Sequence, residues 1–134
     1  MRKTLLTVVL ILLLPVMALA QTWVTANQGT VAWDAVAPIA TGDVIKYQVY
    51  TRPDLTSAGA KVGTEITATQ LTITFPSEGK YYVGVQTLRY PTGETSAVTS
   101  AIGWSSDPAV CSPAGPFGFK YFVIPGVIKN MRVP

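Results

Sequence analysis

The stretch Phe75-Pro76-Ser77-Glu78-Gly79-Lys80-Tyr81-Tyr82-Val83-Gly84-Val85-Gln86-Thr87 predicts the end of one β-strand, a tight corner and a long second strand. Its second half alternates, with Tyr81, Val83, Val85 and Thr87 on one side and Tyr82, Gly84 and Gln86 on the other. A period of two residues is typical of a strand with one buried face. We therefore expect a central strand that organises the rest of the chain.

Other short segments show the same alternation and are separated by turn residues. We expect strands at residues 23–26, 30–33, 44–51, 61–66, 70–75 and 95–102. Sequences such as Thr41-Gly42-Asp43 and Tyr90-Pro91-Thr92-Gly93 have the composition of the turns between them. No amphipathic helix of useful length is found. The pattern predicts an all-β fold, an antiparallel β-sandwich.

The alternation also predicts which side chains face the core. The inward set comprises Val31, Trp33, Ile45, Tyr47, Val49, Leu71, Ile73 and Phe75. Three tyrosines, Tyr50, Tyr82 and Tyr90, are expected on the outer surface, where they could stack on a sugar or a protein partner. Isolated exposed aromatic side chains are common, so these three positions do not by themselves indicate a binding site.

Residues 23–102 resemble a fibronectin type III domain at several spaced positions. The family has a Trp on its second strand, which Trp33 matches, and a Tyr-x-Val pattern on its third strand, which Tyr47 and Val49 match. The family also has a corner in which a Tyr follows an apolar residue by six positions, the spacing of Phe75 and Tyr81.

Gly93-Glu94-Thr95 adds to this resemblance, because the family has Gly-Glu-Ser after its sixth strand. The chain departs from the family where Phe75 replaces Leu, where Pro76 comes one place early and where Pro91-Thr92 lengthens a loop. These departures concern loop shapes. The resemblance implies an immunoglobulin-like sandwich in which Tyr81 forms a tyrosine corner, with its hydroxyl bonded to the main chain a few residues upstream.

The first 20 residues have the layout of a secretory signal peptide. Arg2 and Lys3 precede an apolar run that ends at Pro15, and Ala18-Leu19-Ala20 precedes Gln21. A membrane anchor is the alternative, but a spanning helix needs about 20 apolar residues and a proline interrupts this run. We predict cleavage after residue 20, no membrane attachment afterwards, and a secreted location in the periplasm, the extracellular space or at the cell surface.

Three parts are therefore expected along the chain: a signal peptide (1–20), a fibronectin type III-like domain (21–104), and a Pro/Gly-rich linker with a C-terminal β-strand extension (105–134). Removing Arg2 and Lys3 lowers the ten basic residues to eight, against seven acidic ones. The exported part is nearly neutral and has no basic cluster, so we expect no nucleic-acid partner.

The sequence offers little that supports catalysis. It contains no histidine, the usual general base, and its seven carboxylates lie singly in predicted turns and edges. No sequence motif for a metal, a phosphate loop or an activated serine occurs. We therefore expect a protein that is not an enzyme, with no catalytic residues, no metal site and no cofactor.

Cys111 is the single cysteine of the chain and cannot form an internal disulfide. Two readings remain open: a free thiol in a Pro/Gly-rich loop, or a disulfide to another chain, which an odd cysteine in a secreted protein favours. A second candidate contact lies at Arg89 and Tyr90, next to a loop where fibronectin type III domains sometimes carry adhesive motifs. The Arg-Gly-Asp tripeptide of such motifs is absent.

Residues 117–124 read as a further strand, with Phe119 and Tyr121 on its more apolar face. An apolar strand has to be covered, either by its own domain or by a neighbour's open sheet edge. Folding back is the preferred reading because it avoids the free-energy cost of association, about 4 to 15 kcal/mol. Exchange between chains would instead lead to a filament, because head-to-tail contacts need not close.

Two functions follow from these features. The first is an exported, non-catalytic β-sandwich module that acts in extracellular or cell-surface structure and assembly, with a protein partner or self-association through the C-terminal strand. The alternative is a module that binds carbohydrate or protein through its loops, as an accessory to an exported enzyme or adhesin.

Overall fold

The computed structural model describes residues 20–134. The predicted signal peptide lies outside these described residues except for Ala20. Between residues 20 and 134 the chain contains β-strands, turns and irregular segments but no helix. The fold is therefore all-β, as the alternating sequence predicts, and its strands form two sheets.

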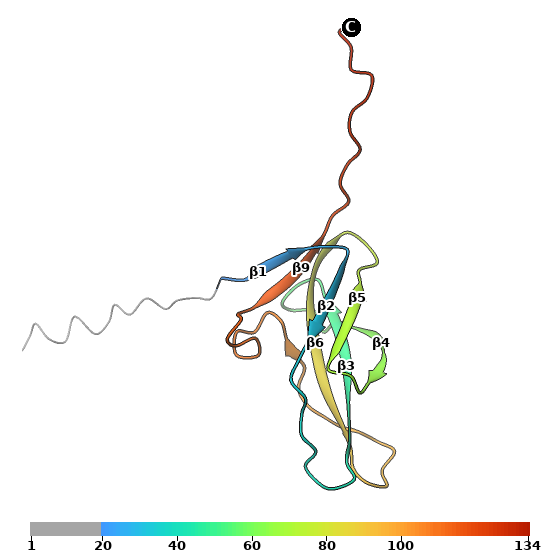
Figure 1. Cartoon of the computed structure of the whole chain (residues 1–134), viewed down its shortest axis with the longest axis vertical. Helices are drawn as coiled ribbons and strands as arrows, with labels where there is room; N and C mark the ends of the chain where they lie inside the picture. Colours follow the sequence, from blue (N-terminus) through green and yellow to red (C-terminus); the bar gives the residue numbers. More distant parts are fainter. Residues whose placement is uncertain (1–19) are drawn as a thin grey trace, which may run out of the picture.

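The larger sheet is built around β6 (Gly79–Tyr90), the strand predicted from the corner sequence. One side of β6 pairs with β3 (Val44–Arg52), which pairs in turn with β4 (Ala60–Ile66). The other side pairs with β7 (Val98–Thr99), β8 (Gly103–Trp104) and β9 (Phe117–Tyr121). All of these pairs are antiparallel. The first strand, β1 (Thr22–Thr25), runs parallel to β9 at the edge of this sheet (Figure 1).

The smaller sheet has two antiparallel strands, β2 (Gln28–Ala32) and β5 (Gln70–Thr74). Side chains of both sheets share one hydrophobic core, an arrangement consistent with a β-sandwich. Its buried members are Val31, Val49, Ile73, Phe75, Val83 and Phe119. Alternation along each strand explains this set, because the apolar side chain of every second residue turns toward the opposite sheet.

The corner before β6 has the geometry that the sequence predicts. The hydroxyl group of Tyr81 donates a hydrogen bond of 2.6 Å to the carbonyl oxygen of Ser77. The ring of Tyr81 stacks on Phe75, with centroids 4.6 Å apart, and Phe75 lies 5.2 Å from the ring of Phe119. The tyrosine thus ties the turn to the core by one polar and one apolar contact.

Three short strands, β7, β8 and β9, pair with the edge of β6 that lies opposite β3, where one longer strand is expected from residues 95–102 alone. Of the predicted strand 95–102, only Val98–Thr99 pairs with β6, and the pairing register shifts before β8. After β8 the chain makes an excursion and returns to the same edge as β9. The amide of Phe117 donates to the carbonyl oxygen of Ser105 at 2.8 Å, which closes the base of this excursion. Residues 106–116 thus form a compact loop on the body.

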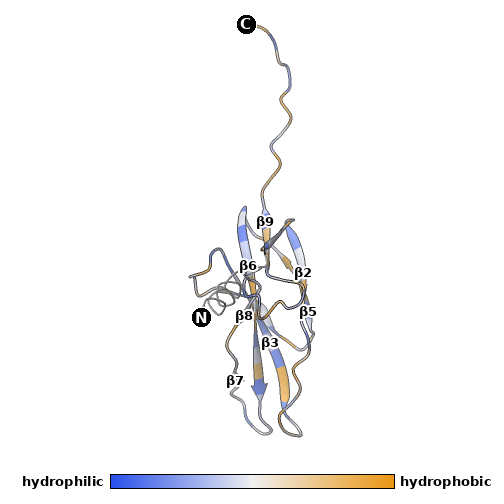
Figure 2. Ribbon diagram, turned by 90° about the vertical axis from the view of Figure 1, so that its left-hand side faces the viewer, coloured by the Kyte–Doolittle hydropathy of each residue, from blue (hydrophilic) through white to orange (hydrophobic). Residues whose placement is uncertain are grey.

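Residues 117–124 fold back onto their own sheet, but the strand ends at Tyr121. The next side chain, Phe122, is 55% exposed, and the amide of Val123 donates to the carboxylate of Glu78. Beyond this contact the chain stands away from the body as an extended segment (Figures 1 and 2). We refer to residues 124–134 as the tail.

One predicted surface tyrosine is buried. Tyr82 is on the outer face of the sheet, as the alternation requires, but it is only 8% exposed. The indole ring of Trp23 on β1 covers it, with ring centroids 5.3 Å apart. The prediction of an exposed Tyr82 is wrong because the outer face of a sheet stays open only where no other segment lies on it.

Candidate functional site

A cavity of about 440 Å³ lies between the two sheets, beside β2. Apolar side chains from both sheets, from the residue after β2 and from the loop 106–116 make most of its wall: Val31, Trp33, Tyr47, Val83, Val85, Val110 and Phe117. A volume of this size and an apolar lining are usual for sites that hold a small ligand or an inserted side chain. The cavity is therefore the first candidate for a binding site.

The cavity exists because β1 belongs to the large sheet. β1 precedes β2 in the chain by only two residues, Ala26 and Asn27, yet it pairs with β9 and not with β2. The small sheet is left with two strands, and in the described part of the chain no strand pairs with the free edge of β2. The loop 106–116 covers part of the gap with Val110, Cys111 and Gly115, and the remaining space is the cavity.

Trp33, one of the residues that line the cavity, has a polar group without a partner in the described chain. The indole Nε1 of Trp33 is buried and makes no hydrogen bond within residues 20–134. A buried donor without an acceptor costs free energy, about 1 to 3 kcal/mol. The ring of Trp33 also packs on Tyr47 in an edge contact, with centroids 5.5 Å apart, so Trp33 both supports the core and lines the cavity.

Cys111 lines the same cavity and is partly buried. Its thiol lies 3.4 Å from the carbonyl oxygen of Ser105, to which it can donate. Burial, and to a smaller extent the charge of Asp107, raises the pKa of the Cys111 thiol. A protonated thiol is a poor nucleophile, so the geometry favours a packed thiol over a reactive one.

Within residues 20–134, β2 pairs only with β5, which leaves its other edge free, and Val31 and Ala32 of this strand line the cavity. The amide of Trp33 donates to Thr69 and that of Phe75 to Asn27, each at 2.9 Å, which sets the direction of pairing between β2 and β5. Because the hydrogen-bonding direction alternates along a strand, the amide of Thr30 points away from β5. The hydroxyl groups of Thr30 and Thr72 meet at 2.8 Å, as expected for a pair of residues without main-chain bonds between them.

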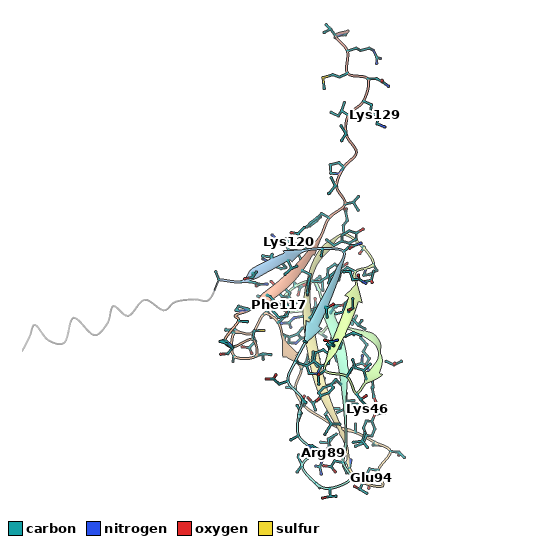
Figure 3. All side chains as sticks on the ribbon, viewed as in Figure 1. Lys46, Arg89, Glu94, Phe117, Lys120 and Lys129 are labelled. Carbon is teal, nitrogen blue, oxygen red and sulfur yellow. The ribbon has the colours of Figure 1, made fainter. Side chains whose placement is uncertain are left out.

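The tail is the most exposed apolar segment of the described chain. Its apolar side chains are between 75% and 93% exposed: Ile124, Val127, Ile128, Met131 and Val133. Lys129 lies far out along it (Figure 3). Apolar side chains grouped on one extended segment often indicate a contact surface.

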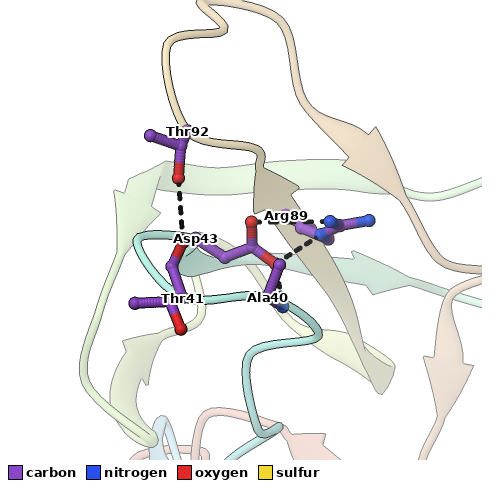
Figure 4. A network of polar contacts seen from close by, with 5 residues as sticks. All are labelled: Ala40, Thr41, Asp43, Arg89 and Thr92. Atoms are coloured by element: carbon purple, nitrogen blue, oxygen red, sulfur yellow. Dashed lines mark hydrogen bonds and ion pairs between the residues drawn. The ribbon is translucent and has the colours of Figure 1, made fainter.

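Arg89, a predicted interaction residue, is engaged within the molecule. Its Nε lies 2.6 Å from Oδ2 of Asp43, and its Nη2 lies 3.4 Å from Oδ1 of the same carboxylate (Figure 4). The amide of Ala40 also donates to Asp43, and Thr92 donates to the carbonyl oxygen of Thr41. These bonds join the loop before β3 to the end of β6. Arg89 and Asp43 thus form an ion pair in which the side chain of Asp43 is only 1% exposed.

Tyr90 also has a partner within the fold. Its hydroxyl group donates to the carboxylate of Glu65 at 2.8 Å, which raises the pKa of Tyr90, and the ammonium group of Lys46 lies 5.1 Å from its ring. Lys46 is also 3.8 Å from Glu65. Lys46 and Arg89 lie at the end of the molecule opposite the tail (Figure 3).

The two predicted interaction residues of the C-terminal strand have different settings. Phe119 is 4% exposed and belongs to the core, where its ring meets Phe75 and Phe117. Tyr121 is partly buried and packs against that core from the end of β9. Both residues bind β9 to its own domain, and the exposed apolar side chains come after them in the chain.

Within residues 20–134, no three His, Cys, Asp or Glu side chains are grouped closely enough to hold a metal ion. The same part of the chain has no helix that is long and apolar enough to cross a membrane.

Comparison of the chain with protein-family models, with curated proteins and with solved structures found no match. The cavity, the free edge of β2 and the tail are the features of the molecule that bear on function. Sequence reasoning missed the first two, because nothing in the sequence of β1 shows that it pairs with β9. The apolar residues of the tail, by contrast, can be recognised in the sequence.

Proposed function

We propose that this chain is an exported, non-catalytic module that builds extracellular or cell-surface structures by associating with further copies of itself. Its fold is a fibronectin type III-like sandwich, and its contact is strand addition. The tail of one copy pairs with the free edge of β2 in the next copy. The observation that carries this proposal is the tail itself, an extended segment whose large apolar side chains are almost fully exposed.

The arrangement of strands supports the fibronectin type III-like assignment. One sheet has the order β4-β3-β6 followed by the segments β7, β8 and β9, and the other contains β2 and β5. The tyrosine corner at Tyr81 and the aromatic pair of Trp33 and Tyr47 are the features that the sequence resemblance implies. The position of β1 beside β9 is the departure that opens the small sheet.

The acceptor surface supports the choice of β2. Its free edge offers main-chain groups to an added strand, as in other cases of β-strand addition. The adjoining cavity offers space for apolar side chains from that strand. The unpaired indole donor of Trp33 would find an acceptor in an inserted carbonyl group. The lining of this cavity includes Val31 and Ala32 of β2 and no residue of β5.

The direction of the tail favours a second copy over its own domain. The tail leaves the end of β9 and points away from the body, so it would have to reverse to reach β2 of its own chain (Figure 2). Burying its five most exposed apolar side chains gains about 7.5 to 15 kcal/mol in total at about 1.5 to 3 kcal/mol each. Association costs about 4 to 15 kcal/mol, so we expect assembly that depends on protein concentration.

The test is the oligomeric state of the chain from Gln21 to Pro134, measured by light scattering over a range of concentrations. We expect large species at high concentration and a monomer after removal of residues 125–134. This truncation keeps the contact between Val123 and Glu78, so the melting temperature of the monomer should not fall. A full-length chain that stays monomeric at all concentrations would refute the proposal.

A matched pair of variants tests the acceptor edge. Thr30→Pro removes an amide from the free edge of β2, whereas Thr72→Pro removes one from the outer edge of β5. Only Thr30→Pro should prevent assembly. Equal loss of assembly in both variants, with both still folded by circular dichroism, would show that β2 is not the acceptor.

A further inference from the structure

Trp23 lies on the outer face of the large sheet, with its indole ring directly against the main chain of β9. Trp23 projects from β1 across Gly118 of β9, where a Cβ atom would come within 2.6 Å of the indole ring. Only glycine permits this close approach. The ring of Tyr82 packs against the indole in a tilted contact, at 5.3 Å between centroids. The indole is thus held as a flat surface on the sheet and remains partly exposed.

Two lysines flank this ring. Lys80 on β6 and Lys120 on β9 are directly opposite each other in the antiparallel register, on the same face as Trp23 (Figure 3 shows Lys120). Their ammonium groups lie 5.3 and 5.2 Å from the centroid of the indole. Like charges directly opposite each other are unfavourable, and the ring compensates for this only in part. Within residues 20–134, no carboxylate lies within 4.0 Å of either ammonium group.

Trp104, on the same face of the sheet, also contacts a cation, but this cation has a hydrogen-bond partner within the fold. Its ring lies over Gly84 and Gly59, and the guanidinium group of Arg52 stacks on it at 3.9 Å. Arg52 also donates to the hydroxyl group of Ser106 at 3.2 Å. The cation at Trp104 is therefore held by a side chain of the fold, whereas neither lysine at Trp23 has such a partner among the described residues.

A further donor lies at the same place. The side-chain nitrogen Nε2 of Gln21 is buried, makes no hydrogen bond within the described chain and lies close to Gly118. The Oε1 atom of Gln21 accepts a hydrogen bond of 3.4 Å from the hydroxyl group of Tyr82. The surface around Trp23 thus combines a flat apolar ring with hydrogen-bond donors that lack acceptors.

We propose that Trp23, Lys80 and Lys120 form a binding site for an acidic saccharide. The C–H face of a pyranose ring stacks on the indole, and its carboxylate lies between the two ammonium groups. An anion at this point relieves the repulsion between the lysines and gives charge-assisted hydrogen bonds to both. A flat ring fixed against the main chain suits the rigid face of a sugar better than a flexible acidic peptide. The site is separate from the tail and from the β2 edge.

Titration calorimetry with tetragalacturonate tests the site, with its fully methyl-esterified form as the neutral counterpart. To exclude self-association, the measurement uses the protein without residues 125–134. Thermal denaturation checks that this shortened protein is folded. We expect saturable binding of the acid, weaker binding at high salt and little binding of the ester. Lys80→Gln and Lys120→Gln should each weaken binding about tenfold or more, the effect of losing one charge-assisted bond.

Lys61→Gln is the matched control, because it removes the same charge from an exposed lysine on β4. It should leave the affinity unchanged, and Trp23→Phe should reduce it while the protein stays folded. Three results would overturn the proposal: no saturable binding of the acid, equal loss of affinity in Lys61→Gln, or equal binding of a glutamate oligopeptide, which would indicate an unspecific anionic contact.

Discussion

The two ends of β6 are stabilised by different forces. At its start, Tyr81 and Val83 pack into a core with Phe75 and Phe119, whose side chains are 3% and 4% exposed. At its end, Arg89 and Tyr90 are held by carboxylates from β4 and from the loop before β3. Apolar burial depends little on pH or salt, whereas contacts with carboxylates depend on both. We call the start of β6, which is held by apolar packing, its packed end, and the other end, which is held by contacts with carboxylates, its electrostatic end.

The largest effect is expected at the packed end. Phe119→Ala should lower the free energy of unfolding by about 3 to 5 kcal/mol, because it leaves a cavity among aromatic rings. A domain of this size has a total stability of about 5 to 15 kcal/mol, so we expect the variant to unfold at a clearly lower urea concentration than the wild type. Urea denaturation measures the change.

Phe122→Ala is the control for that substitution, because Phe122 is three residues further along and 55% exposed. Its cost should stay below about 0.5 kcal/mol. Similar costs for the two variants would show that β9 is not an integral part of the core.

A smaller effect is expected from the hydroxyl group of Tyr81. Tyr81→Phe removes the hydrogen bond to Ser77 and keeps the stacked ring, so it should cost about 0.5 to 1.5 kcal/mol. Tyr90→Phe makes the same change at the electrostatic end, where the acceptor is the carboxylate of Glu65. Raising the salt concentration should reduce the effect of Tyr90→Phe but not that of Tyr81→Phe, which denaturation at two ionic strengths would show.

The smallest effect is the pH dependence of stability. The side-chain hydrogen bond from Arg89, followed by the amide of Ala40, holds the pKa of Asp43 below its ordinary value of 3.8. A lowered carboxyl pKa gives stability that is present above the unfolded pKa and is lost as the pH falls through the folded pKa. The urea midpoint should therefore fall on acidification below about pH 4, and by less in Asp43→Asn.

A second carboxylate, that of Asp54, contributes to the same loss of stability at low pH. Amide and hydroxyl groups of Ser57 and Thr56 lower the pKa of Asp54 from its ordinary value of 3.8 to about 2, so its part of the stability is lost between these two pH values. Asp54→Asn should flatten the pH profile in this range. A wild-type midpoint that is constant down to about pH 2 would contradict both assignments.

Much of the fold could be predicted from local pattern. The alternation from Tyr81 onward gave the central strand, and the spacing from Phe75 to Tyr81 gave a corner that the hydrogen bond to Ser77 confirms. The inward position of Tyr47 is confirmed by its 3% exposure. These features were predictable because they depend on residues within a few positions of each other.

The candidate sites could be predicted less well. The predicted strand 95–102 is reduced to Val98–Thr99 among those residues, because the serine hydroxyl of Ser100 takes up the amide of Thr87 and the register then shifts. The contact between Arg89 and Asp43 joins residues 46 positions apart, which no local pattern reveals. The sequence predicted an apolar C-terminal strand at residues 117–124, whereas four of the most exposed apolar side chains lie beyond it, at Val127, Ile128, Met131 and Val133.

The sequence by itself determined the period of two residues, the turns and the side of each strand that is buried, since these depend on the chemistry of neighbouring residues. The tertiary structure alone decided that β1 pairs with β9, and this one pairing opens the cavity beside β2, buries Tyr82 under Trp23 and brings that ring to Lys120. The physical reason is that a strand's main-chain groups can bond to any available edge. The choice between edges depends on the packing of side chains far apart in the sequence.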